Sequence, residues 1–267
     1  MHHLYADRRM AVKPFEKITN FRDIGGLQSE DGRMMKTGIL FRSGEPSRLT
    51  AQDLVKLNAL NLKLICDLRT PNERKSRIMP THQNRTIRVV NIPISQHEED
   101  YTRFEFFMLM MKSASTIDLE KMMKDFYRRI AFESMPQIRD VITLLGEEKN
   151  VPALIHCAGG KDRTGVMVAL IQLLAGVARD TVMADYMLSN SLTEARMKRA
   201  ATFLRYTSLF RLTHDRLKPL LEVRRDYLED VLDEILSEYG AIEAYLIEGC
   251  GISEHLLHKV KELLLHS

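Results

Sequence analysis

The sequence predicts an α/β fold, in which a mostly parallel central sheet is flanked by helices and followed by a helical C-terminal region. Over the first two thirds of the chain, short apolar runs alternate with helical patterns, which is typical of parallel strands joined by crossover helices. No stretch rich in Gly, Ser or Pro divides the 267 residues, and 45% of them are apolar, enough for one large core. We therefore expect a single domain over residues 1–267.

The expected strands are short apolar runs at residues 38–42 (GILFR), 62–68 (LKLICDL), 87–94 (IRVVNIPI) and 151–155 (VPALI). Helices are expected between them at residues 50–60, with Thr50 as N-cap, and at 119–132, 135–145 and 164–177. The last of these has apolar residues at nearly every turn, so it should be buried. Residues 20–26 (NFRDIGG) predict a turn in which Gly25 and Gly26 take special backbone angles and Asp23 caps or pairs.

The C-terminal third, residues 180–267, is predicted to be helical and packed on the core. An apolar stripe indicates one of its helices, and Gly240 is placed to end that helix; the stripe consists of Leu228, Val231, Leu232 and Ile235. Two long connections, residues 104–111 (FEFFMLMM) and 193–223, are interpreted as helices packed on the core. A lid within 193–223 is the alternative.

The chemistry is concentrated in residues 156–165 (HCAGGKDRTG), between a predicted strand and a predicted helix. Glycines there allow a tight backbone curl, and the free N–H groups of a helix N-terminus favour an anion. A nucleotide-binding G-x-x-x-x-G-K-[ST] loop is excluded, because Ile155 replaces its first glycine and Asp162 replaces its Ser or Thr. What remains is Cys157, five residues and Arg163, a spacing that lets amides and a guanidinium converge on one oxyanion above the sulfur.

These residues resemble the cysteine-dependent protein tyrosine phosphatases, and in particular the bacterial enzymes with an HCxxGKDRTG loop, some of which also act on phosphoinositides. Three further motifs carry the resemblance: NFRDIGG at 20–26, FRSG at 41–44 and DLRTPNER at 67–74. The likeness spans roughly residues 14–250. It implies a protein tyrosine phosphatase-like fold, helical lids in the long connections, and a reaction that uses no cofactor and no metal.

The predicted reaction is phosphate monoester hydrolysis through a phosphocysteine. Cys157 is the expected nucleophile, and Arg163 is the expected clamp on two phosphate oxygens. Thr164 is placed to donate to the sulfur, and the resemblance implies that His156 positions the cysteine. The phosphate-binding loop then comprises Ala158, Gly159, Gly160, Lys161, Arg163 and Thr164.

Two carboxylates are candidates for the acid that protonates the leaving oxygen. Asp162 lies inside the loop, where lipid phosphatases with a C-x(4)-D-R-T loop also have an aspartate. Asp67 lies at the end of a predicted strand. The interpretation favours Asp162, with Asp67 orienting the loop. Lys161 either selects multiply phosphorylated headgroups or raises the local potential, and the sequence does not choose between these roles.

Composition narrows the class of partner and the compartment. The formal charge of +3 is far from the basic excess typical of nucleic-acid binding. With no apolar run of 18 residues and no apolar signal core at residues 1–10, we expect a cytoplasmic protein without membrane insertion.

Cys66, Cys157 and Cys250 cannot all pair, and a nucleophilic thiol needs reducing conditions. Cys66 is interpreted as a plain buried cysteine, a disulfide with Cys157 being the alternative. Export by a non-classical route needs no signal sequence, so the sequence leaves that route open.

No metal site is predicted. His255 and His258 share a helix face, and His214 precedes Asp215, but neither pair has the further ligands that a metal site needs.

The sequence therefore predicts a phosphatase acting on phosphotyrosine, with phosphoserine, phosphothreonine and phosphoinositides left open as further substrates. Three alternatives are kept: an enzyme that acts mainly on phosphoinositides, a catalytically silent phosphate-binding module, and a sulfurtransferase. Silent modules usually lose the Cys, the Arg or the acid, and all three are present here; a sulfurtransferase loop lacks the Arg-Thr pair after the Asp.

Overall fold

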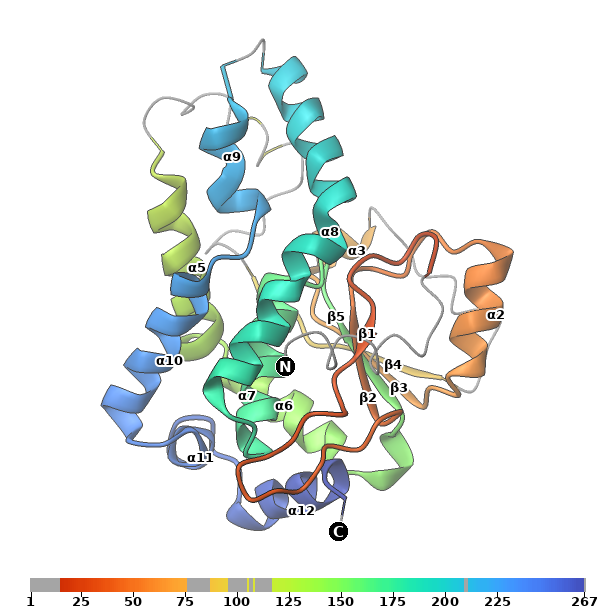
Figure 1. The fold of residues 1–267 in the computed structure, drawn as a ribbon, viewed down its shortest axis with the longest axis vertical. Coiled ribbons are helices and arrows are strands. Elements are labelled where there is room, and N and C mark those ends of the chain that lie inside the picture. The colour runs from red at the N-terminus through yellow and green to blue at the C-terminus, as the bar shows by residue number, and fades with distance from the viewer. Residues whose placement is uncertain are drawn as a thin grey trace.

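The computed structural model describes residues 15–75, 87–95, 105, 108, 117–208 and 211–266. Its centre is a five-stranded sheet in the order β1-β2-β5-β3-β4 (Figure 1). The strands are β1 (Arg22–Asp23), β2 (Leu40–Ser43), β3 (Leu64–Asp67), β4 (Arg88–Asn91) and β5 (Ala153–His156). All neighbouring pairs are parallel except β1 and β2. The predicted α/β fold class is confirmed, and each predicted strand is found within two to three residues of its expected bounds.

The helices of the described residues are α2 (Ala51–Ala59), α3 (Pro71–Lys75), α5 (Leu119–Phe132), α6 (Met135–Leu145), α7 (Asp162–Leu174), α8 (Arg179–Thr207), α9 (His214–Leu221), α10 (Arg225–Tyr239), α11 (Ile242–Ala244) and α12 (Glu254–Leu264). A 3-10 turn at Glu148–Asn150 precedes β5, and a π-helical turn at Tyr245–Gly249 follows α11. The helix-rich C-terminal region is therefore as predicted.

Alternation along the strands gives the sheet two apolar faces. On one face Phe41, Ile65 and Leu154 pack in a small cluster with Leu57 of α2. On the other face the neighbouring strand residues join a large cluster that includes residues of α5, α6, α7, α10 and α12. Figure 1 shows this division, with α2 on one side of the sheet and α5, α6, α7 and α10 on the opposite side.

Local signals set several helix ends as predicted. Thr50 caps α2 by accepting a hydrogen bond from the Asp53 amide, and the Asp53 carboxylate completes a capping box. Helices α5 and α6 have the bounds expected from their periodicity. Gly240 ends α10 with φ of +76°, where a side chain would be strained. Helix α7 begins two residues earlier than predicted, which places Asp162 in its first turn.

Residues 20–26 form the expected turn and also a strand that was not predicted. The Asp23 carboxylate accepts hydrogen bonds from the Gly25 and Gly38 amides, at 2.8 and 2.5 Å. Gly26 has φ of +73°, as predicted, but Gly25 has no positive φ, so the prediction for Gly25 is wrong. A Cβ atom on Gly25 would instead lie 2.1 Å from the Lys36 carbonyl oxygen. Arg22 and Asp23 pair with β2 as an antiparallel edge strand, which is too short to show a period of two residues.

The connection at residues 193–223 is helical on both sides of residues 209–210, which lie outside the described residues. The distal part of α8 and all of α9 pack with the start of α5 in a separate apolar cluster, which contains Leu119, Ala201, Leu212, Leu217 and Leu221. Of the other long connection, residues 104–111, only Glu105 and Met108 are described, so its predicted helix lies outside the described residues.

Candidate active site

The loop at residues 157–161 joins β5, the middle strand of the sheet, to the N-terminus of α7. It therefore lies at the carboxyl edge of the parallel strands, where open α/β sheets place their ligands. Gly160 has φ of +67°, and a Cβ atom there would lie 2.4 Å from the Ser43 carbonyl oxygen. Only glycine lets the loop curl this tightly against the end of β2.

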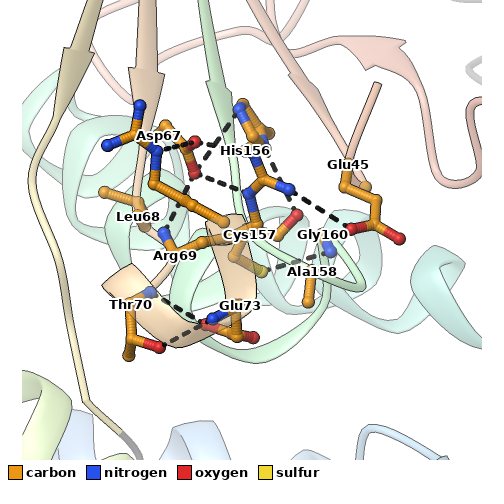
Figure 2. A network of polar contacts seen from close by, with 12 residues as sticks. Glu45, Asp67, Leu68, Arg69, Thr70, Glu73, His156, Cys157, Ala158 and Gly160 are labelled. Atoms are coloured by element: carbon orange, nitrogen blue, oxygen red, sulfur yellow. Dashed lines mark hydrogen bonds and ion pairs between the residues drawn. The ribbon is translucent and has the colours of Figure 1, made fainter. Parts of the chain in front are cut away.

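Cys157 is buried at the base of this loop, with 2% of its surface exposed. Its Sγ accepts a hydrogen bond from the Gly160 amide at 3.2 Å, and Figure 2 shows the sulfur facing that amide across the loop. The loop backbone thus turns at least one N–H toward the sulfur. An N–H group in this position can also donate to an oxyanion held above the sulfur.

Three side chains hold the loop carbonyls from outside. Arg42 and the Asn20 side-chain amide both donate to the Gly160 oxygen, at 2.8 and 2.6 Å. Arg196 of α8 donates to the Ala158 oxygen at 2.8 Å. Because these carbonyls are turned outward, the loop amides are left to face the interior of the curl. Neither Asn20 nor Arg196 was identified from the sequence as a residue that supports the loop.

Behind these contacts, Asp185 of α8 binds two buried arginines. It accepts hydrogen bonds from Arg22 at 3.1 Å and from Arg42 at 3.4 Å. Burial and the adjacent Arg22 charge lower the pKa of Arg42 to about 9, against the opposing effect of Asp185. Arg42 therefore remains mainly protonated at neutral pH.

Arg163 is held by Glu73 of α3 in a two-pronged ion pair, with N···O distances of 2.6 and 2.8 Å. Its Nη1 also donates to the Leu68 and Ile94 carbonyls, both at 3.2 Å. Burial alone would lower the pKa of Arg163, but the hydrogen bonds and charge of Glu73 outweigh it and raise that pKa above its ordinary value. The guanidinium is therefore fixed in place and always charged.

Asp162, in the first turn of α7, is half-buried and accepts a hydrogen bond from the Tyr127 hydroxyl at 2.8 Å. The Tyr127 and Tyr186 hydroxyls are 2.6 Å apart. Burial, together with the Asp162 charge, raises the pKa of both tyrosines well above 10, so both hydroxyls stay protonated. Tyr127 gives its one proton to Asp162, so Tyr186 donates to Tyr127.

The carboxylate of Asp67, at the end of β3, contacts the side chain of Arg69. The Arg69 side chain donates to both of its carboxylate oxygens, at 2.9 and 2.8 Å (Figure 2). Burial opposes ionisation of Asp67, but the hydrogen bonds and the charge of Arg69 outweigh it and hold the pKa of Asp67 below its usual value. Asp67 is therefore a buried, ionised carboxylate with both oxygens engaged.

His156 is fully buried, and its Nε2 lies 3.6 Å from Asp67. Burial lowers the pKa of His156 to about 4, with Asp67 opposing the shift and Arg69 adding to it. The imidazole is neutral at pH 7. Its Nδ1 lies 3.3 Å from the Cys157 carbonyl oxygen, so it contacts the backbone of the nucleophile candidate.

The remaining loop residues differ in where they point. Lys161 is buried, and its Nζ donates to the Leu221 and Leu220 carbonyls at the end of α9, at 2.6 and 3.3 Å. Its ammonium thus contacts α9. Thr164 is fully buried, and its Oγ1 has no hydrogen-bond partner within the described part of the chain. Ala158 and Gly159 are half-buried at the top of the loop.

The remaining predictions concern the cysteines, metal sites and membrane-spanning helices. All three cysteines are free and buried, and burial raises the pKa of Cys66 to about 12. Over the described ranges we find neither a group of three or more metal-ligating side chains nor a helix long and apolar enough to cross a bilayer.

Comparison with known proteins identifies the family of this chain. The family model described as the tyrosine phosphatase family matches residues 13–266. A candidate tyrosine-protein phosphatase of Cupriavidus necator is 30% identical over 237 residues, covering 87% of this chain and 81% of its own length. The triple specificity protein phosphatase PtpB of Mycobacterium tuberculosis is 29% identical over 283 residues, covering 96% of this chain and all of its own. The solved catalytic core of Siw14 aligns with 84% of this chain and 94% of its own, with a TM-score of 0.36 and 14% identity. The matching model extends over nearly the whole chain, so the protein belongs to the tyrosine phosphatase family.

Proposed function

We propose that the protein hydrolyses phosphotyrosine through a phosphocysteine on Cys157. Sγ attacks phosphorus, the S–P bond forms, and the P–O bond to the tyrosine breaks as its oxygen takes a proton. Water then attacks phosphorus, the S–P bond breaks, and inorganic phosphate leaves. The observation that carries the proposal is the Gly160 amide aimed at Sγ from 3.2 Å, in a loop whose carbonyls are bound from outside.

The contacts of Arg163 support its role as the phosphate clamp. Glu73 and two carbonyls occupy Nη1 and one hydrogen of Nη2. Within the described residues Nε has no hydrogen-bond partner, so Nε–H and the second hydrogen of Nη2 remain. These two donors lie along one edge of the planar guanidinium, an arrangement suited to two oxygens of one phosphate.

The hydrogen bond from Tyr127 supports Asp162 as the proton donor. Asp162 starts the helix that carries Arg163, so it is fixed relative to the phosphate site. In the first step it gives a proton to the leaving oxygen, and in the second it takes one from the attacking water. Asp67 is assigned the orienting role, since Arg69 engages both of its oxygens.

The substrate range proposed is phosphotyrosine first, with phosphoserine, phosphothreonine and phosphoinositides as further substrates. The name of the PtpB relative supports a broad range, since it describes a triple specificity phosphatase. Lys161 could add a cation for a second phosphate only after leaving the α9 carbonyls that it now binds. A preference for multiply phosphorylated headgroups therefore requires α9 to move.

The proposal also covers domain organisation and compartment. We treat the chain as one domain because a single apolar cluster joins Ile24, near one end of the described residues, to Leu265, near the other. We treat residues 193–223, which include α9, as helices packed on the core, which the apolar cluster that they share with α5 supports, and a lid within them stays the alternative. A free thiol nucleophile requires reducing surroundings, which favours the cytoplasm.

A substrate panel tests the proposed function. Initial rates would be measured on a phosphotyrosine peptide, a phosphoserine peptide and a short-chain phosphoinositide, each with and without a chelator. We expect the phosphotyrosine peptide to be hydrolysed equally in both conditions, since Arg163 and the loop amides supply the charge stabilisation. Phosphate binding without turnover of any substrate would indicate a silent module. Activity lost to the chelator and restored by a divalent metal would overturn the mechanism.

Replacing Tyr127 with Phe tests how Asp162 is positioned. The variant loses the hydrogen bond to a carboxylate, and we expect it to slow an alkyl phosphate by about 10-fold while leaving a nitrophenyl phosphate nearly unchanged. The matched control is Tyr245→Phe, because the Tyr245 hydroxyl is equally buried but donates to the Ala131 carbonyl. The control should lose stability and keep the ratio of the two rates. If both variants leave that ratio unaltered, Tyr127 does not position the acid.

A further inference from the structure

The outward side of α8 carries large apolar side chains that remain exposed. Leu188 and Leu192 are 39% and 37% exposed, and Phe203 and Tyr206 are 63% and 64% exposed. At 100° per residue, all four positions fall within about 60° of arc around the helix. We call these four residues the outer stripe of α8.

The opposite side of the same helix is packed. Met197, Ala201 and Leu204 belong to the cluster that α8 shares with α9 and the start of α5. Figure 1 shows α9 and α5 together on one side of the upper half of α8. The outer stripe therefore lies on a helix whose other face already has its apolar partners.

Phe203 and Tyr206 of the outer stripe, but not Leu188 and Leu192, lie in the most basic part of the sequence. Residues 195–218 contain seven Lys or Arg and one Asp, a net charge of +6, whereas the whole chain carries +3, so the remaining residues sum to −3. Arg199 is exposed and falls inside the arc of the stripe. The exposed Lys198 and Arg205 lie about 80–100° from the near edge of the stripe, both on the same side. Lys198 is paired with Glu194 at the helix surface.

We infer that the outer stripe of α8 binds an anionic lipid surface. Aromatic side chains prefer the headgroup level of a bilayer, and Lys or Arg side chains near an anionic leaflet are attracted to its negative surface charge. Two exposed rings one turn apart, with an arginine within the stripe, match such a surface in both polarity and charge. A second copy of this chain is a poorer occupant, because it would bring together the exposed Arg199 of two chains and the exposed cations beside it.

The position of α8 ties this surface to the phosphate loop. Arg196 lies on the flank of the same helix and donates to the Ala158 carbonyl at 2.8 Å and to the Thr19 hydroxyl at 3.2 Å. Docking through the outer stripe would therefore hold the loop close to the membrane. The inference concerns binding and does not depend on the chemistry of Cys157, so it can fail or succeed separately from the proposed function.

Vesicle co-sedimentation tests the inference. The full chain is mixed with phosphatidylcholine vesicles with or without phosphatidylserine, at low and high salt. We expect binding only when phosphatidylserine is present, and weaker binding at high salt. A Phe203→Ser/Tyr206→Ser double variant and an Arg199→Glu variant should each bind at least about 10-fold more weakly. All variants should keep wild-type rates on a soluble aryl phosphate.

The matched control is Val55→Ser on α2, where a single apolar side chain is 70% exposed on the other side of the sheet. Its vesicle binding should equal that of the wild type. Equal binding by the Phe203→Ser/Tyr206→Ser variant, or no binding by the wild type, would overturn the inference. So would binding that excess inorganic phosphate abolishes and sodium chloride of equal ionic strength does not, which would assign the headgroup to the phosphate loop. A dimer that the double variant dissociates would also overturn it.

Discussion

Replacing Cys157 with Ser is expected to lower turnover by more than about 1,000-fold while phosphate binding persists. A serine hydroxyl ionises far less readily than a thiol, so neither the loop amides nor the charge of Arg163 can make it an adequate nucleophile. The loop itself should keep its shape, because the substitution changes one atom. Steady-state rates and phosphate binding by calorimetry measure the two effects separately.

The control for this substitution is Cys250→Ser, which makes the same change in a buried thiol that belongs to the large core cluster. It should lose some stability and keep its turnover number. Acid quenching during turnover should trap phosphate on the wild type and on the control, and on neither after Cys157→Ser. Hydrolysis by Cys157→Ser above about 1% of the wild-type rate would remove Cys157 from the role of nucleophile.

Replacing Asp162 with Asn is expected to slow poor leaving groups far more than good ones. A proton donor matters in proportion to the basicity of the departing oxygen, so an alkyl phosphate should slow by about 100- to 10,000-fold. A nitrophenyl phosphate, whose leaving oxygen needs little help, should slow much less. Comparing the kcat values for the two substrates measures this difference directly.

The same comparison on Asp67→Asn separates the two carboxylates. Asp67 engages Arg69 through both oxygens, so its loss should disturb the site and lower both rates together. If Asp67→Asn shows the leaving-group dependence and Asp162→Asn does not, the assignment is reversed. Equal losses on both substrates in both variants would point to water or to an acid from another segment.

Much of the fold could be predicted because its signals are local. Helix α5 shows a clear amphipathic period from Leu119 to Phe132, and α10 ends at a glycine with positive φ. Strands β3 and β5 are short apolar runs, which mark buried parallel strands. The loop between β5 and α7 could also be predicted, because Cys157 and Arg163 belong to one short stretch of backbone and their spacing is visible in the sequence.

The partners of the buried charges could not be predicted, because they are set by tertiary approach. Arg163 pairs with Glu73, 90 residues away, and Arg22 pairs with Asp185, 163 residues away. No periodicity links such positions. The contact of Lys161 with α9 was missed for the same reason: the sequence placed its ammonium in the loop, whereas the packing of α9 places two carbonyls beside it.

The sharing of Asp185 by Arg22 and Arg42 restricts how this protein can diverge. A change that removes the Asp185 carboxylate alone leaves two guanidiniums buried side by side, a loss of several kcal/mol. A change that removes one arginine alone also removes a support of the Gly160 carbonyl or of Asn20. A substitution at one of these three positions is therefore expected to lower stability unless the other two positions change with it. The effects of mutations at residues 22, 42 and 185 should be strongly epistatic, even though the residues are carried by three different elements.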